Sequence, residues 1–245
     1  MIDLPRVIGH RGAAAHAPEN TLAGFKAAAA FGLDWVEFDV RLSKDGVPVL
    51  VHDDTLDRTT DGTGPVAAKT ADELKRLDAG AWFDPRFAGE RVLTLIDALD
   101  AIHDLGMRPN IEIKTNPGEA WRTGRVVGAT LDKAWPPGRP RPLVSSFVLR
   151  CLMGFRQARP DVPTGLNIWR RSRWQWSIGA RVLGCMSVHF SERQVTDAQI
   201  RAVKAAGRQV VCYTVNDAAK AQSLFARGVD AVFTDVPDVI LPVLR

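Results

Sequence analysis

Short runs of strand-forming residues alternate with helical patterns along all 245 residues of the chain. Such alternation predicts βαβ units and a parallel sheet. Eight candidate strands and eight candidate helices therefore predict an α/β fold, a (β/α)8 TIM barrel, whose functional groups gather at the carboxyl ends of the strands. The candidate strands cover residues 7–10, 35–40, 110–114, 143–146, 164–168, 185–189, 209–214 and 231–234. The candidate helices cover residues 19–31, 95–104, 119–134, 148–158, 173–182, 197–206, 217–226 and 237–243.

One stretch, residues 54–91, does not fit the alternation. It is far longer than the ~2–6 residues of a usual βα connection, and long loops on barrels tend to serve function. We expect one TIM-barrel catalytic domain over residues 1–245, since barrels of this length form single domains. The stretch at 54–91 is then a small insertion after the second βα unit that caps the barrel mouth. Thr196 and Asn216 precede two of the helices and are predicted to cap them.

Two acids, Glu37 and Asp39, interrupt a run of strand-forming residues. Residues two apart in a strand point the same way, so both carboxylates share one face. Glu112 repeats the pattern in a later candidate strand. Buried carboxylates are costly unless a cation meets them, and three oxygen ligands without a nearby cysteine favour Mg²⁺ or Ca²⁺ over zinc. The alternative is a wet rim at which water solvates the acids.

Two histidines also end strand-like runs, His10 at the first candidate strand and His52 after residues 47–51. Together with Arg11 and Lys114 they predict a site for a phosphate ester. Imidazole suits acid–base work because its unperturbed pKa is about 6.5. Arg11 can hold two phosphate oxygens at once, whereas Lys114 acts as a point charge. A single histidine at a strand end is commonly structural, so His189 is left out of the predicted site.

The net charge of +4 is unevenly spread. Residues 139–181 hold nine arginines and one acid, so this segment carries +8 and the rest of the chain −4. Such a patch can attract nucleic acid or an anionic membrane. We interpret it instead as a solvated outer face whose arginine stems pack over apolar neighbours, and we expect no nucleic-acid partner.

Three cysteines, Cys151, Cys185 and Cys212, stand at wide spacings in apolar surroundings, which indicates buried thiols and no disulfide or zinc framework. The sequence has no signal-peptide pattern and no apolar run of membrane-spanning length. We therefore expect a cytoplasmic protein without stable membrane insertion. Residue types do not set its oligomeric state.

Seven blocks of residues resemble the signature of the glycerophosphodiester phosphodiesterase family. Any one block is weak evidence, but seven in the family's order across almost the whole chain are strong. The short form is similar to the cytoplasmic bacterial members. The blocks are residues 10–12 (HRG), 18–21 (PENT), 37–39 (EFD), 52–60 (HDDTLDRTT), 112–114 (EIK), 213–216 (YTVN) and 228–235 (GVDAVFTD).

The resemblance implies a barrel with an insertion after its second βα unit, and a metal-dependent hydrolase of small-molecule substrates. These are glycerophosphodiesters, such as glycerophosphocholine or glycerophosphoethanolamine, cut to sn-glycerol 3-phosphate and an alcohol. Tyr213 stands where many members carry tryptophan and is implied to line the glycerol pocket, although a core role is an alternative. The implied site comprises metal ligands Glu37, Asp39 and Glu112, acid–base groups His10 and His52, and phosphate-binding Arg11 and Lys114.

Three other functions compete with this one. A related phospholipase C- or D-like enzyme would act on a larger lipid headgroup. A catalytically silent anion-binding module would use the arginine-rich segment at 139–181. An isomerase or lyase on the same fold gives no clear role to two histidines together with Arg11 and Lys114.

Overall fold

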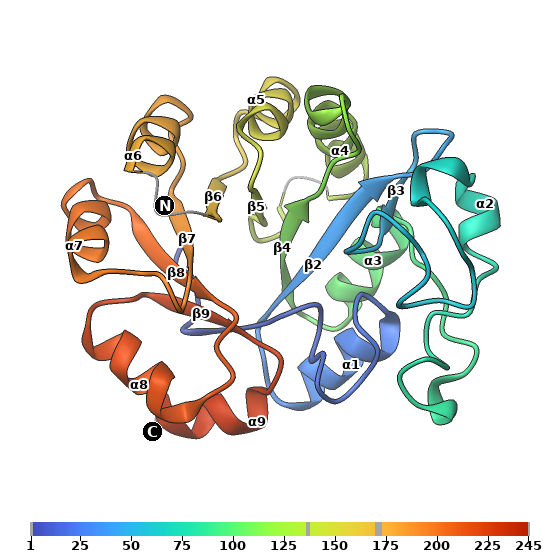
Figure 1. Ribbon diagram of the computed structural model, residues 1–245, viewed down its shortest axis with the longest axis horizontal. Coiled ribbons are helices and arrows are strands. Elements are labelled where there is room, and N and C mark those ends of the chain that lie inside the picture. Colours follow the sequence, from blue (N-terminus) through green and yellow to red (C-terminus); the bar gives the residue numbers. More distant parts are fainter. Residues whose placement is uncertain (1, 136–137, 170–172, 245) are drawn as a thin grey trace.

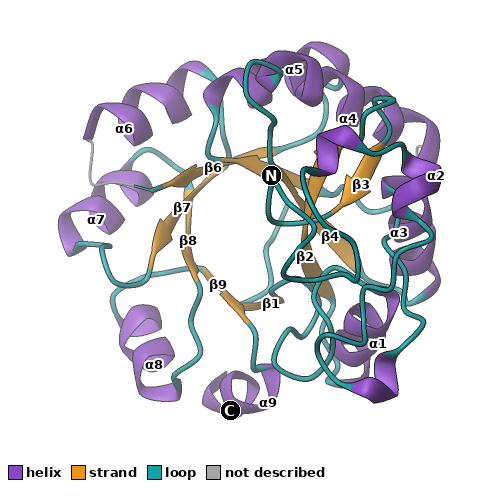
Figure 2. Ribbon diagram, turned by 45° about the vertical axis from the view of Figure 1, so that its right-hand side comes forward, coloured by secondary structure: helices purple, strands orange, loops and turns teal. Residues whose placement is uncertain are grey.

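Eight parallel strands close into a barrel (Figures 1 and 2). The computed structural model describes residues 2–135, 138–169 and 173–244. The ring closes because β1 pairs with β2 on one side and with the last strand, β9, on the other. The predicted TIM barrel is confirmed. Its strands are β1 (Val7–Gly9), β2 (Trp35–Leu42), β4 (Arg108–Ile113), β5 (Leu143–Ser146), β6 (Thr164–Ile168), β7 (Ser187–Ser191), β8 (Gln209–Tyr213) and β9 (Ala231–Thr234).

Helices form the outer ring (Figure 2), and threonines mark several of their starts. Helix α1 begins three residues later than predicted, because the Thr21 side chain accepts a hydrogen bond from the Gly24 N–H and so acts as the N-cap. Thr196 caps α7 as predicted, but the prediction for Asn216 is wrong, since Asp217 caps α8. The helices are α1 (Leu22–Ala30), α3 (Leu95–Asp104), α4 (Ala120–Ala134), α5 (Leu149–Ala158), α6 (Arg173–Val182), α7 (Asp197–Ala205), α8 (Ala218–Ala226) and α9 (Pro237–Ile240), with the 3₁₀ helix η3 (Leu241–Leu244) after α9.

Strand β2 divides its side chains between two environments. Val36, Phe38 and Val40 are fully buried in the main core under the helices. Glu37 and Asp39 point the other way, into the barrel, as the alternation of strand side chains requires. A separate apolar cluster is formed by other side chains in or next to the strands. It comprises Ile8, Trp35, Leu143, Met186, Val211, Ala231 and Phe233.

The extra segment lies between β2 and α3, so it interrupts the second βα unit between its strand and its helix. It starts with β3 (Pro48–Leu50), which runs antiparallel to β2. Short helices follow: η1 (Val66–Ala68), α2 (Ala71–Leu74) and η2 (Pro85–Phe87). The segment has its own buried apolar cluster, which includes Leu56 and Leu74. Apolar packing of its own gives this irregular segment a fixed shape at the side of the barrel (Figure 1).

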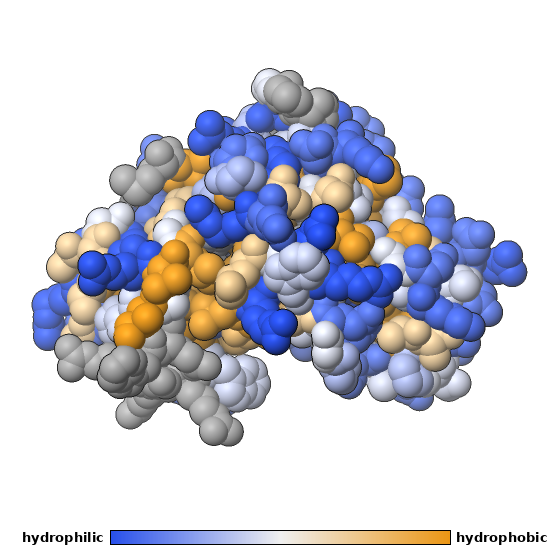
Figure 3. Space-filling model, turned by 90° about the horizontal axis from the view of Figure 1, so that it is seen from above, coloured by the Kyte–Doolittle hydropathy of each residue, from blue (hydrophilic) through white to orange (hydrophobic). Residues whose placement is uncertain are grey.

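The surface of α4, α5 and α6 mixes hydrophilic and hydrophobic residues (Figure 3). In the arginine-rich segment, Arg139 lies over the Trp135 ring at 5.1 Å from its centroid, and Arg159 pairs with Asp161 at 2.8 Å. These contacts fit the interpretation of a solvated face with packed stems; Arg170 and Arg171 lie outside the described residues. All three cysteines are buried and free, as predicted. No described helix is long and apolar enough to cross a membrane.

Candidate active site

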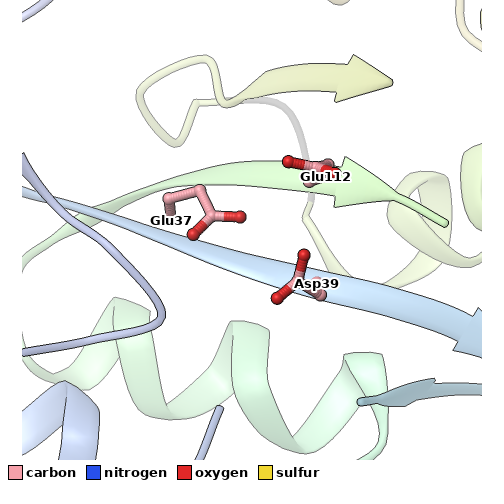
Figure 4. Close-up of side chains that lie close together, drawn as sticks. All are labelled: Glu37, Asp39 and Glu112. Atoms are coloured by element: carbon pink, nitrogen blue, oxygen red, sulfur yellow. The ribbon is translucent and has the colours of Figure 1, made fainter. Parts of the chain in front are cut away.

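Three carboxylates from two neighbouring strands meet inside the barrel (Figure 4). Glu37 and Asp39 come from β2 and Glu112 from β4, and the strand register places Asp39 directly beside Glu112. One oxygen of each residue lies within 4.8 Å of the others. The structure therefore brings together the three acids that the sequence predicted as metal ligands.

The charge of this carboxylate cluster is only partly balanced by the protein. Burial raises the pKa of Glu37, and the neighbouring Asp39 and Glu112 raise it further. Burial likewise raises the pKa of Glu112. For Asp39 burial also opposes ionisation, but Lys114 and Arg11 outweigh it and lower the pKa of this carboxyl. The cluster thus holds at least one carboxyl that is poorly stabilised as an anion.

A divalent cation fits this donor set. The Glu37 Oε1 atom is buried and has no hydrogen-bond partner in the described part of the chain. Burying such an oxygen costs free energy unless a ligand binds to it. All three donors are carboxylate oxygens, which magnesium and calcium prefer. Residues Glu37, Asp39 and Glu112 could therefore hold such an ion.

Two basic side chains contact the same acids. Arg11 Nε lies 3.2 Å from Asp39 Oδ2, and Lys114 Nζ lies 3.3 Å from Asp39 Oδ1 and hydrogen-bonds to Glu112. Arg11 has φ of 52°, in the left-handed region. In this conformation its backbone N–H donates to Glu37 Oε2 at 3.0 Å. Backbone strain of this kind is commonly found at functional sites, where the surrounding structure sustains it.

Both predicted histidines lie at this cluster, and a carboxylate holds each ring. His10 Nδ1 lies 2.6 Å from Asp235 Oδ1, and His52 Nδ1 lies 2.6 Å from Asp53 Oδ1. The other ring nitrogen of His10 lies 4.0 Å from Glu37 Oε2 and thus faces the carboxylates. Burial lowers the pKa of His52, which favours its neutral form. Each histidine forms part of a His–Asp pair, an arrangement that fixes ring orientation for proton transfer.

Tyr213 lies at the end of β8, across the barrel from the carboxylate cluster. Its hydroxyl donates to the Ile168 carbonyl at 2.5 Å, and its ring lies edge-on to Phe147 at 5.7 Å. It also lines a cavity together with Trp169 and Thr214. His189 does not join the site: it is fully buried, contacts Ser187 at 2.8 Å, and burial lowers its pKa to about 3. Its omission from the predicted site agrees with this position in the barrel interior.

The sequence profile of the Glycerophosphoryl diester phosphodiesterase family matches residues 10–239. The chain belongs to this family. A glycerophosphodiester phosphodiesterase of Caldanaerobacter subterraneus subsp. tengcongensis is 33% identical over 243 residues, which cover 98% of this chain and 97% of the relative. The resemblance found in the sequence is thereby confirmed.

Solved structures of glycerophosphoryl diester phosphodiesterases have the same fold. A phosphodiesterase of Oleispira antarctica, in complex with the product sn-glycerol-3-phosphate, has a TM-score of 0.93 and 39% identity over 98% of this chain and 97% of that chain. A glycerophosphodiester phosphodiesterase from Agrobacterium tumefaciens has a TM-score of 0.77 and 30% identity over 98% of this chain and 100% of that chain. The overall fold is thus shared across the compared lengths.

Several residues at this candidate site received no role in the sequence analysis. Asn20, with φ of 59°, makes two hydrogen bonds with Asp39: its Oδ1 accepts from the Asp39 backbone N–H at 3.0 Å, and its Nδ2 donates to Asp39 Oδ2 at 3.1 Å. Arg41 Nε donates to the His52 carbonyl at 3.0 Å and so connects β2 to the stretch that follows β3. Asp53 comes shortly after β3, and Asp235 comes directly after β9. This position beyond the end of a strand was the signal that could have identified both residues.

Proposed function

We propose that this chain hydrolyses glycerophosphodiesters, such as glycerophosphocholine and glycerophosphoethanolamine, to sn-glycerol 3-phosphate and an alcohol, with Mg²⁺ or Ca²⁺ bound at the carboxylate cluster. Phosphodiesterase activity follows from membership of the family. The observation that carries the proposal is the meeting of three carboxylates, two cations and two His–Asp pairs at one end of the barrel.

Charge arithmetic supports a divalent cation together with a phosphodiester. The three carboxylates and the two cations that contact them carry one net negative charge when all are ionised. A divalent ion would change this to one positive charge, which matches the single negative charge of a phosphodiester. When bound, such an ion polarises a phosphoryl oxygen and lowers the pKa of a bound hydroxyl group. We assign its ligation to Glu37, Asp39 and Glu112.

We assign the remaining groups by what each can do. Arg11 and Lys114 would bind the non-bridging phosphate oxygens, with Arg11 offering two parallel donors and Lys114 a point charge. Hydrolysis also moves two protons: one leaves the attacking oxygen, of water or of the neighbouring glycerol hydroxyl, and one reaches the oxygen of the departing alcohol. If the glycerol hydroxyl attacks first, water then opens the cyclic phosphate. His10 and His52, each held at Nδ1 by a carboxylate, would carry these protons at Nε2. Tyr213 would line the substrate pocket.

The test is a substrate assay on purified protein. We expect release of sn-glycerol 3-phosphate from glycerophosphocholine with Mg²⁺ or Ca²⁺, and loss of that release after treatment with a chelator. Restored activity on adding back either ion would identify the ions that serve. Product formation unaffected by complete metal removal would contradict the metal assignment, and the absence of product with either ion would contradict the proposed substrates.

A further inference from the structure

Strand β2 carries a third polar residue on the face that holds two carboxylates of the cluster. Arg41 follows Glu37 and Asp39 at the spacing of two that keeps side chains on one side of a strand. Its guanidinium bonds to the main chain of two other segments. The Nε atom donates to the His52 carbonyl at 3.0 Å, and Nη1 donates to the Thr115 carbonyl at 3.3 Å. One half-buried side chain of β2 thus joins the stretches that follow β3 and β4.

The hydrogen-bond partners of this guanidinium are neutral. Among the described residues, no carboxylate oxygen lies within 4.0 Å of the Arg41 nitrogens. In contrast, Arg11 and Lys114 both contact the carboxylate of Asp39. Arg41 therefore forms no close ion pair with the carboxylate cluster. A guanidinium has a planar fork of donors in fixed directions, which suits it to hold two carbonyl groups in one geometry.

The main chain of His52 depends on this contact. Within the described residues, the bond from Arg41 is the only hydrogen bond that the His52 backbone groups form. The carboxylate that holds the His52 ring belongs to Asp53, the next residue in the chain, so this pair does not fix its own position relative to β2. Arg58, which holds Asp53 in turn, lies at the surface. Arg41 thus supplies the bond that ties this histidine directly to the strand of the carboxylates.

The stretch after β4 depends less on Arg41. The Lys114 N–H donates to the Val40 carbonyl at 2.9 Å, and the Asn116 side chain donates to the Leu42 carbonyl at 3.2 Å. Two main-chain carbonyls of β2 therefore hold the residues on both sides of the carbonyl that the guanidinium contacts. Loss of the guanidinium would leave Lys114 in place and release the histidine main chain on the other side.

We propose that Arg41 is a positioning residue for His52, which it holds in place beside the carboxylate cluster without contacting the substrate. The inference rests on the proposed function, in which His52 carries a proton. Because displacing a reacting group by about 1 Å can lower a rate about 100-fold, we expect the smaller shift in Arg41→Met to lower kcat about tenfold. KM should stay within about twofold, because Arg11 and Lys114 keep their positions.

The test measures kcat for glycerophosphocholine with Arg41→Met introduced into two backgrounds. In the unaltered protein the substitution should lower kcat about tenfold. In His52→Ala it should lower kcat less than about twofold, because the group that Arg41 positions is already gone. Arg208→Met is the matched control: this guanidinium also donates to two main-chain carbonyls, but outside the candidate site, and its loss should leave kcat unchanged.

A conservative variant separates the guanidinium fork from its charge. Arg41→Lys keeps the positive charge but cannot hold both carbonyls, so its kcat should remain at least about threefold below that of the unaltered protein. Full activity in Arg41→Lys would assign the effect to charge and overturn the inference. An equal loss in both backgrounds would overturn it too, and so would a rise in KM with unchanged kcat, which would place Arg41 in contact with the substrate.

A spectroscopic measurement tests the same inference without turnover. The chain has five histidines, so the NMR signal of each ring Cε1–H group can be followed. The signal of His52 is identified by its absence in His52→Ala. Arg41→Met should shift this signal and leave that of His103, on α3, unchanged. An unmoved His52 signal would overturn the inference. If the unaltered protein cleaves no glycerophosphodiester, the proposed function fails, while this measurement still decides whether Arg41 positions the ring.

Discussion

The two His–Asp pairs at the barrel mouth have the same inner geometry but are assembled in different ways. His10 and Asp235 stand 225 positions apart and meet because β1 and β9 are neighbours. His52 and Asp53 are adjacent in the chain. The carboxylate of the first pair is held by the neutral amide of Asn216, whereas that of the second is held by the guanidinium of Arg58.

This difference shows that one pair depends on the barrel and the other on the interrupting segment. Arg58 lies in that segment and also pairs with Glu19 at 2.7 Å, next to the start of α1. Glu19 in turn pairs with Arg11 at 2.8 Å. The segment is thus connected through charged side chains to the proposed phosphate site. Substitutions at each pair would separate these two contributions.

The largest effect is expected from removing either histidine. His10→Ala and His52→Ala should each lower kcat by at least about 100-fold, the usual scale for losing a general acid–base group. Steady-state assays with glycerophosphocholine measure the loss, and His103→Ala, on the exposed surface of α3, serves as the control. Near-normal turnover in one variant would show that the two pairs are not equivalent and would remove that histidine from its proposed role.

A change at Glu37 should alter the carboxylate cluster, at which both His–Asp pairs lie. Glu37→Gln keeps the shape of the side chain but removes a charge from the carboxylate cluster, so affinity for Mg²⁺ or Ca²⁺ should fall at least about tenfold. Titration calorimetry of the protein without substrate measures this directly, and Asp104→Asn at the end of α3 is the control. Unchanged ion affinity would exclude Glu37 as a ligand, whatever happens to turnover.

The carboxylate that holds His10 should affect the rate more than substrate binding. Asp235→Asn should lower kcat about 10- to 100-fold, in the range seen when the partner that orients a functional histidine is lost. KM should stay within about twofold, because Asp235 contacts His10 and Asn216 in this structure and neither is proposed to bind phosphate. A rise in KM with unchanged kcat would instead assign Asp235 to substrate binding.

The smallest effect is expected at Arg58. Arg58→Ala removes the ion pairs to Asp53 and Glu19, but the guanidinium is 44% exposed. The free energy of unfolding should therefore change by less than about 1 kcal/mol in urea denaturation. Turnover should fall a few-fold, since the ring of His52 is less well held. A loss as large as that of His52→Ala would mean that the segment does more than orient this histidine.

Much of this arrangement could be predicted from local sequence patterns. Alternation within strands placed Glu37 and Asp39 on one face, and strand order placed Glu112 near them, because parallel strands end at the same side of a barrel. His10 and His52 were found for the same reason. These inferences need only the period of two in a strand and the position of each strand end.

Other parts depend on information that local patterns do not contain. The pairing of His10 with Asp235 follows from ring closure, which no stretch of residues around either position encodes. Asn216 was mistaken for a helix cap because its position suits one, while its side chain turns to Asp235 instead. Arg58 lies in irregular backbone, where no repeat predicts the direction of a side chain. The hydrogen bonds of Asn20 to Asp39, and that of the Arg11 backbone N–H to Glu37, depend on left-handed backbone that these residue types do not require.

The junction of β1 with β9 has a consequence for biosynthesis. A nascent chain on the ribosome can already contain the three carboxylates, Arg11, Lys114 and both histidines while Asp235 has not yet been made. Its His10 ring then lacks the carboxylate of Asp235, which reaches it only when β9 pairs with β1. Full enzymatic turnover would thus report completion of the ring.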